Sequence, residues 1–321
     1  MTNKNTDVFH YSSFIMKFKR LIKFIILVII FYALLAFNVF HIGEKLVPST
    51  KDYLNTNIPQ DNQDIENTYL TPNTAIQVQT GHWAAATTMN LDDLCNSINI
   101  CDKIHFEGTF SDTEKYNYTK IFSKIVQFID SNSTEDNNIK NVITDVAISK
   151  EDGDRRGYAT HNSIVFNIWL VKSQKEFINL SAHEMGHITD LGYIQWTSSK
   201  KDKNYTEFGR AVFSVDDLSL GFYKLSRDKE TIRKTEAKKK DFCSGYGMSD
   251  PFEDFAECFN LYTNHNSFFK QIAKSNTTLK SKYNLIASIF NGQYLSSNTQ
   301  DLTLIKSDTS RRPRDTTKLS N

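Results

Sequence analysis

The hydrophobic and polar positions divide the chain into an apolar stretch, a polar stretch and a region of regular periodicity. Residues 24–37 read FIILVIIFYALLAF and carry no charge. Residues 43–90 are rich in Asn, Thr, Gln and Asp and contain several prolines, which predicts a polar stalk. Beyond the stalk the apolar residues recur regularly, so we expect the folded domain to span residues 91–295.

Helical and strand-like segments are mixed along residues 91–295. Residues 118–129 have apolar side chains at helical spacing. Residues 141–148 and 161–170 are rich in β-branched and aromatic side chains and predict two strands, separated by a turn at 152–157. This mixture indicates the α+β class.

Two further helices have clear start signals. Ser173 with Glu176 has the form of a capping box, and this helix is predicted to end near Gly192, a suitable C-terminal cap. Asp250 followed by Pro251 is an N-cap with proline at the first helical position. More helix is expected after this second one, which gives the domain a mostly helical C-terminal lobe.

Two polar segments lie in the second half of the chain. Residues 226–240 read SRDKETIRKTEAKKK, with both signs of charge at helical spacing, and predict a solvated helix face. The alternative, a basic nucleic-acid patch, is disfavoured because acidic residues interrupt it and no aromatics interleave. The net charge is +1, so no nucleic-acid partner is expected. Residues 296–321 are rich in Ser, Thr, Asp, Lys and Arg and predict a disordered tail.

The apolar stretch predicts one membrane helix over residues 21–42, because about 20 apolar residues span a bilayer. Basic residues crowd its N-terminal side, whereas the charges beyond it nearly cancel. The positive-inside rule then places residues 1–20 in the cytoplasm as a short tail and the remainder outside. We expect a single-pass protein of the cell membrane, held in the lipid by this helix, with an extracellular domain. Secretion after signal cleavage is the alternative, although no A-x-A pattern follows the stretch.

The chain has four cysteines, Cys95, Cys101, Cys243 and Cys258. An even number on an exported chain suggests disulfides, and the local pairs Cys95–Cys101 and Cys243–Cys258 are the simplest pairing. The alternative is that some are buried thiols. Their spacing fits no compact zinc knuckle, so they are not read as metal ligands.

The strongest chemical motif is HEMGH at residues 183–187, an H-E-x-x-H sequence on a predicted helix. His183 and His187 lie one turn apart on one helical face, so both imidazoles can converge on one zinc ion. Glu184 can reach a water beside that ion without binding the metal itself. The motif therefore predicts hydrolysis by metal-activated water with Glu184 as the general base. The alternative is two surface histidines on an ordinary helix.

A catalytic zinc site needs a third protein ligand. Asp190 and Tyr193 occupy the glycine and third-histidine positions of the extended metzincin motif, which argues against that class. The remaining common ligand is a glutamate on a second helix, and Glu253 and Glu257 lie four residues apart there. One can bind zinc while the other accepts a hydrogen bond from a ligand histidine. Glu253 is favoured as the ligand, but the swap stays open because Asp250 and Glu253 also look like a capping pair.

Residues 246–259 read YGMSDPFEDFAECF. This sequence resembles the Y-G-x(5)-E-x-F-A-E-x-F segment of the anthrax lethal factor catalytic-domain family, where it follows an H-E-F-G-H helix. The resemblance covers roughly residues 140–295. It implies zinc ligation by His183, His187 and Glu253, with Glu257 behind them and Glu184 as the base. It also implies that Tyr246 supplies the phenol that stabilises the oxyanion or aids the leaving group.

These observations predict a zincin-like fold of the Glu-zincin kind behind one transmembrane helix, acting as a zinc endopeptidase on proteins or peptides. Residues 161–170 are a candidate edge strand for substrate, with a core strand as the alternative. Two rival functions remain. One is a catalytically inactive zincin-fold protein that serves as a surface binding module, and the other is an anchored structural protein without metal.

Overall fold

The computed structural model describes residues 90–194, 198–207, 209–210, 213–297 and 312–319. The predicted cytoplasmic tail and membrane helix, and all but the last residue of the stalk, lie outside these residues. Within the described part, no helix is both long enough and apolar enough to cross a bilayer.

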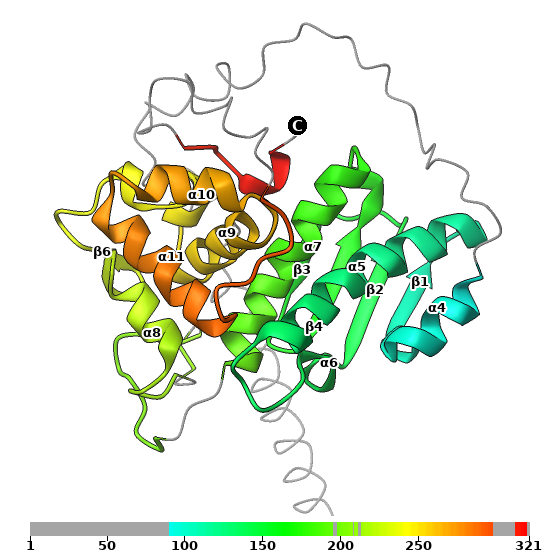
Figure 1. The fold of residues 1–321 in the computed structure, drawn as a ribbon, viewed down its shortest axis with the longest axis horizontal. Helices are drawn as coiled ribbons and strands as arrows, with labels where there is room; N and C mark the ends of the chain where they lie inside the picture. Colours follow the sequence, from blue (N-terminus) through cyan, green and yellow to red (C-terminus); the bar gives the residue numbers. More distant parts are fainter. Residues whose placement is uncertain (1–89, 195–197, 208, 211–212, 298–311, 320–321) are drawn as a thin grey trace, which may run out of the picture. The chain divides into compact units, whose positions relative to one another are not determined.

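A four-stranded sheet is the framework of the described residues (Figure 1). Its order is β1-β2-β4-β3, with strands β1 (Ile104–Glu107), β2 (Asp145–Ser149), β4 (Ser163–Asn167) and β3 (Gly157–Ala159). β1, β2 and β4 are parallel, whereas β3 is antiparallel to β4. The register places Val146 of β2 opposite Ile164 of β4, and Tyr158 of β3 opposite Val165 of β4.

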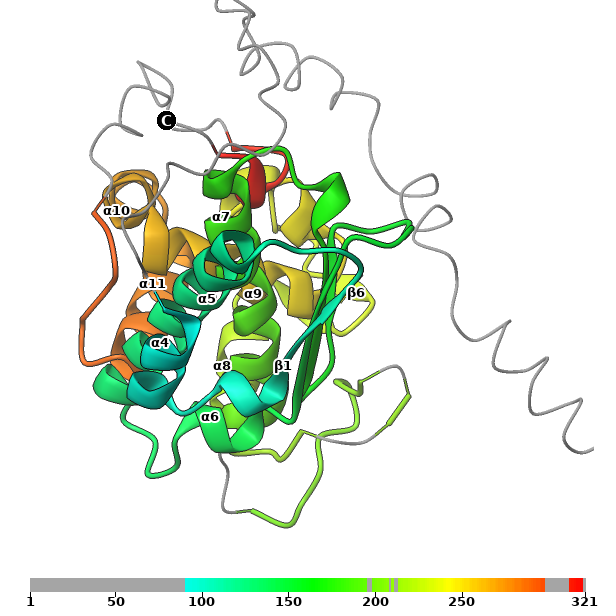
Figure 2. The ribbon, with the colours of Figure 1, turned by 90° about the vertical axis from the view of Figure 1, so that its right-hand side faces the viewer.

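Helices α5 (Asp112–Asn132) and α7 (Gln174–Ile188) cover the same face of this sheet. Figure 2 shows both helices on one side of the strands. Phe166 on β4 lies between Phe122 of α5 and Phe177 of α7, with ring centroids 6.0 and 5.1 Å apart. All three rings are fully buried and meet edge to face, so this aromatic cluster is part of the hydrophobic core.

The remaining helices complete the α+β fold. Helix α9 (Pro251–Asn264) packs along α7, and the others are α4 (Leu91–Ile98), α6 (Ile139–Val142), α8 (Leu218–Tyr223), α10 (Asn266–Ala273) and α11 (Thr277–Ile289). Short 3₁₀ helices occupy Cys101–Lys103, Ile168–Leu170, Lys239–Asp241, Tyr246–Met248 and Thr316–Lys318. Disulfides link Cys95 to Cys101 and Cys243 to Cys258, which are the local pairs.

Several sequence expectations about individual segments are wrong. Residues 226–240 contain a hairpin of β5 (Arg227–Lys229) and β6 (Ile232–Arg233) rather than a helix. The helical spacing of charges predicted an exposed helix face, but Ser226 and Arg227 are buried. Arg227 instead donates hydrogen bonds to the carbonyl oxygens of Glu230 and Met248.

The two predicted strands are shorter than expected. The first begins only at Asp145, because the preceding residues form α6, and the second ends in a 3₁₀ turn after Asn167. The second strand, β4, is also internal, so the edge-strand hypothesis for residues 161–170 is wrong. The edge of the sheet next to α7 is β3, which lies in the segment read as the end of a turn.

Gly192 has a role other than the predicted C-terminal cap. Helix α7 continues into a π-helical turn, Thr189–Tyr193, that includes this glycine. A Cβ atom at Gly192 would lie 1.9 Å from the carbonyl oxygen of His161. The glycine is therefore needed for close approach of two backbones and not for ending the helix.

The expectation of a disordered tail is wrong for residues 312–319. Arg312, Thr316 and Thr317 are at most 2% exposed, and Leu319 is 7% exposed. The segment lies against the ends of α7 and α9 (Figure 1). A polar composition failed to predict this burial because the segment is held mainly by hydrogen bonds to backbone groups and buried polar side chains.

Candidate metal centre and active site

Helix α7 carries the H-E-x-x-H motif into the interior. Ser173 caps its start, accepting a hydrogen bond from the Glu176 backbone amide at 3.1 Å. The Glu176 carboxylate bonds the Lys172 amide instead of the Ser173 amide, so the predicted capping box is only half formed. Two turns further on, His183, Glu184 and His187 are each at most 8% exposed.

Helix α9 brings the acidic partners against that face. A Cβ atom at Gly186 would lie 2.8 Å from the Cα atom of Ala256, so only glycine allows this closeness of the two helices. Asp250 caps α9 by accepting from the Glu253 amide at 2.8 Å. This cap uses only the backbone of Glu253, so its carboxylate is free to face the histidines.

Potential metal-ligand atoms of three side chains converge between helices α7 and α9. Glu253 Oε2 lies 3.1 Å from His183 Nε2 and 3.5 Å from His187 Nε2. One ligand atom from each of the three residues falls within 4.8 Å of the others. A tetrahedral zinc site with bonds near 2.0–2.1 Å has ligand atoms about 3.3 Å apart. The two separations from Glu253 Oε2 to the histidine nitrogens lie close to this value.

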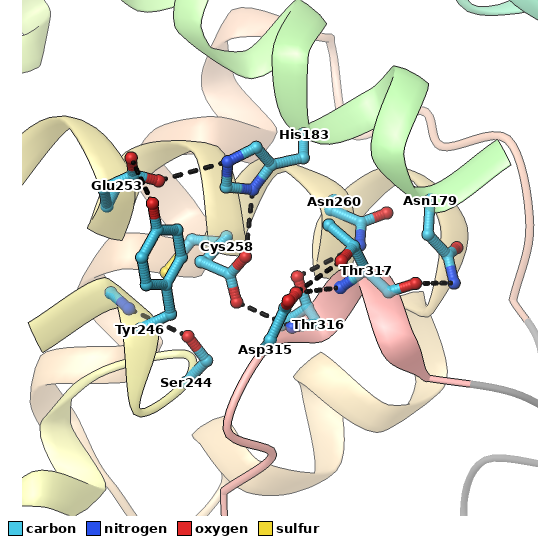
Figure 3. Close-up of polar contacts among 12 residues, drawn as sticks. Asn179, His183, Ser244, Tyr246, Glu253, Cys258, Asn260, Asp315, Thr316 and Thr317 are labelled. Carbon is cyan, nitrogen blue, oxygen red and sulfur yellow. Dashed lines mark hydrogen bonds and ion pairs between the residues drawn. The ribbon is translucent and has the colours of Figure 1, made fainter. Parts of the chain in front are cut away.

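Glu257 stands behind the histidine pair. Its Oε1 atom lies 2.9 Å from His183 Nδ1, the ring nitrogen that points away from the convergence point. The other carboxylate oxygen, Oε2, accepts a hydrogen bond of 2.7 Å from the Thr316 backbone amide. The sequence left two arrangements open. In the structure Glu253 lies beside Nε2 of His183 (Figure 3) and belongs to the three-residue cluster. Glu257 contacts the other ring nitrogen of His183.

The charges of this cluster reinforce one another. Burial works to raise the pKa of Glu253, but the two nearby imidazoles outweigh it and hold that pKa well below its ordinary value. Burial works to lower the pKa of His183, but Glu253 and Glu257 raise it well above the usual range. In both cases the paired, charged form is stabilised, as expected of groups arranged around shared charge.

Glu184 lies between the metal donors and the edge strand. A Cβ atom at Gly157, the first residue of β3, would lie 2.7 Å from Glu184 Oε1. Among the described residues, the buried Glu184 Oε2 atom has no hydrogen-bond partner. Burial also raises the pKa of the Glu184 carboxyl. A carboxylate with one free oxygen and a raised pKa is suited to accepting a proton near neutral pH.

Tyr246 reaches the same centre from the loop before α9. Its hydroxyl donates to Glu253 Oε1 at 2.9 Å, and its ring stacks on His183 with centroids 6.1 Å apart (Figure 3). The Glu253 charge, with burial, raises the pKa of Tyr246 well above its ordinary value. The phenol is therefore held in its protonated, donor form.

The positions of the absent metzincin motif lie apart from the donor set. Asp190 is buried and accepts a hydrogen bond of 2.5 Å from the Tyr223 hydroxyl. Tyr193, also buried, lies in the hydrophobic core. Among the described residues, the one cluster with metal-binding geometry consists of His183, His187 and Glu253.

Three residues around this centre were missed from sequence. Gly157 gives Glu184 its space, Arg156 bonds Glu176 and Asp315, and Thr316 holds Glu257. Gly157 ends the DGDRRG turn and offered a weak signal, because a glycine beside a strand often marks a close approach. The contact made by Thr316 comes from its backbone and leaves no signal in the sequence.

Comparisons with protein-family models, with curated proteins and with solved structures give no match. The functional argument therefore depends on the residues and the geometry of this centre.

Proposed function

We propose that this protein is a zinc-dependent endopeptidase of the Glu-zincin kind, with a site like that of the anthrax lethal factor family. The observation that carries the proposal is the convergence of His183, His187 and Glu253 at spacings that suit tetrahedral zinc, beside the buried base Glu184. Two imidazoles and one carboxylate form a common donor set of catalytic zinc, and the chain offers three protein ligands, leaving a position for water.

Zinc bound there would polarise the substrate carbonyl and activate the attacking water. Glu184 accepts the proton of that water and later delivers it to the leaving amine, because its free oxygen faces away from any fixed partner in the described residues. Glu257 fixes the orientation and tautomer of His183 through the 2.9 Å contact. Tyr246 supplies a hydrogen-bond donor for the oxyanion, after exchanging its contact with Glu253 for one with substrate.

The edge strand β3 gives the substrate a place to bind. A peptide added beside β3 in extended form would pair with the backbone edge that no other described strand occupies, and would pass close to Glu184, which packs against Gly157. This geometry suits an unfolded segment of a protein or a peptide. The sequence adds the proposal that residues 21–42 anchor the enzyme in the cell membrane with this domain outside.

The test is zinc content and peptide cleavage of the full-length protein purified in detergent, compared with Glu184→Gln and Glu253→Gln. Wild type should hold about one zinc per chain and cleave a mixed peptide library. Glu184→Gln should keep zinc and lose about 10³–10⁴-fold in rate, because general-base catalysis contributes about that much. Glu253→Gln should lose both.

Three results would contradict the proposal. Wild-type protein that keeps zinc but cleaves nothing would support the catalytically inactive binding module. Wild-type protein without zinc would support an anchored structural protein. Cleavage by Glu184→Gln at the wild-type rate would exclude Glu184 as the base.

A further inference from the structure

The C-terminal segment Arg312–Leu319 meets the proposed active site at several separate points. It is far from α7 and α9 in sequence, yet its residues lie beside both helices (Figure 3). We propose that this segment is a structural part of the active centre, and that the Thr316 backbone amide is a positioning group that holds Glu257 against His183. The inference rests on the proposed zinc site.

The central feature is a hydrogen bond from this segment to Glu257, followed by an ion-pair contact from Glu257 to His183. The Thr316 amide donates to Glu257 Oε2 at 2.7 Å, and Glu257 Oε1 lies 2.9 Å from His183 Nδ1. Thr316 and Glu257 are both fully buried. With one oxygen fixed by the amide, the Glu257 carboxylate has one orientation in which the other oxygen meets His183. Such outer partners of a ligand histidine fix its tautomer and direction.

Side-chain contacts hold Thr316 and its neighbours in position. Asn260 on α9 donates to the Thr316 hydroxyl at 3.0 Å. Asp315 pairs with Arg156, which also donates to Thr317 Oγ1 at 2.7 Å. Because Arg156 directly precedes Gly157, the same guanidinium connects the segment to the edge strand beside Glu184.

Backbone contacts tie the segment to the loop that carries Tyr246. The Tyr246 amide donates to the Arg314 carbonyl at 2.7 Å, and the Gly245 amide donates to the Pro313 carbonyl at 2.8 Å. The Cys243–Cys258 disulfide joins this loop to α9 on its other side. The segment therefore contacts the residues that hold His183, Tyr246 and strand β3 in place. A tail without a structural role would not make all three contacts.

The amide can be removed with little other change. Thr316 is the first residue of a 3₁₀ turn, a position where proline is tolerated. Asp315 before it has φ −150° and ψ 120°, the extended conformation that a residue preceding proline requires. Thr316→Pro thus deletes the donor to Glu257, and also the hydroxyl. Thr316→Ala is the matched control, because it deletes the hydroxyl and keeps the amide.

The measurement is the zinc dissociation constant of the full-length protein, from competition with a chromophoric chelator. Thr316→Pro should weaken zinc binding by about 10–100-fold, the usual cost of losing an outer partner, whereas Thr316→Ala should change it by less than about threefold. In a Glu257→Gln background, Thr316→Pro should add almost nothing, because the amide acts through that carboxylate. Melting temperatures of the zinc-free proteins report any general loss of folding.

Each remaining outcome decides the question. Equal zinc binding by Thr316→Pro and wild type would overturn the inference and leave the zinc site intact. If Thr316→Pro and Thr316→Ala weaken zinc binding equally, the effect comes from the lost contact with Asn260, and the role of the amide is overturned. If Thr316→Pro does not fold, Asp315→Asn decides, because asparagine keeps the cap on Thr317 but loses the ion pair with Arg156. Unchanged zinc binding in that variant would overturn the inference. Wild-type protein without zinc would instead overturn the proposed function.

Discussion

Helix α9 carries buried carboxylates on two of its faces, and the two surroundings differ. On one face Asp254 pairs with Lys282 at 2.6 Å, and both side chains are at most 1% exposed. On the other face Glu253 and Glu257 meet two imidazoles, with Glu184 close by. In the first cluster the Asp254 carboxylate is paired with the Lys282 ammonium group, and the buried Arg227 adds a second positive charge nearby. The second has more carboxylates than imidazoles.

The difference in charge balance distinguishes a structural ion pair from a candidate metal-binding site. Lys282 also donates to the Asp241 carbonyl at 2.8 Å and lies over the Phe242 ring, so its ammonium group is well satisfied. Such a cluster needs nothing from outside the chain. The other cluster has three donors pointing at one position, and an excess of negative charge that a divalent cation would balance. Burial and perturbed charge alone do not indicate function, but convergence with an unbalanced charge does.

Breaking the structural pair should give the largest effect on stability. Lys282→Met leaves Asp254 buried without its cation and should lower the free energy of unfolding by about 3–5 kcal/mol. Zinc affinity should change by less than about threefold, because the donors lie on the other face of α9. Urea denaturation and chelator competition measure the two quantities.

A double variant is the control for that loss. Asp254→Asn combined with Lys282→Met removes both charges of the pair and should recover part of the lost stability. A loss below about 1 kcal/mol in Lys282→Met, or a large loss of zinc affinity, would contradict the division of α9 into two independent faces.

Removing the metal should have the next largest effect, and only on the other cluster. If free zinc stands at about 100 times its dissociation constant, chelation should remove about 2.7 kcal/mol of stability. Thermal melting with and without chelator measures this. Lys282→Met should show the same sensitivity to chelator as wild type, whereas Glu253→Gln should show none. A chelator effect that persists in Glu253→Gln would place the zinc elsewhere.

The two faces also show what the sequence can predict. Asp250, Pro251 and the HEMGH sequence are local signals, and both helices occur as predicted with Ser173 and Asp250 as their N-caps. The spacing of Glu253 and Glu257 places both on one helix face, and that face meets α7. The choice between them depended on packing, since the distances to the two histidines are properties of the helix pair.

The failures have physical reasons of the same kind. The hairpin at Arg227–Arg233 has charges at helical spacing, but burial of Arg227 and its contacts with backbone carbonyls decide its conformation. Strand β3 has only three residues, too few for a periodic pattern, and is defined by its pairing with β4. Residues 312–319 contribute mainly backbone groups to the centre, and backbone hydrogen bonds between distant segments leave no trace in composition.

Asp190 adds a third way of burying a carboxylate, by protonation. It lies three residues after His187, is fully buried and accepts a hydrogen bond from the neutral Tyr223 hydroxyl. Burial raises its pKa to about 8, from an ordinary value near 4. Between these values the folded chain holds a proton that the unfolded chain has released, so the free energy of unfolding must fall as pH rises through this window.

Asp190→Asn should therefore flatten the pH dependence of stability, which is the smallest of the three expected effects. In chelator, wild type should lose about 1–2 kcal/mol more than the variant between about pH 6.5 and 8, measured by urea denaturation. Asp152→Asn, at an exposed position, is the control and should keep the wild-type slope. Equal slopes in wild type and Asp190→Asn would mean that Asp190 is charged when buried. Its charge would then need a cation, and Asp190 would belong with the metal centre instead of with the neutral core.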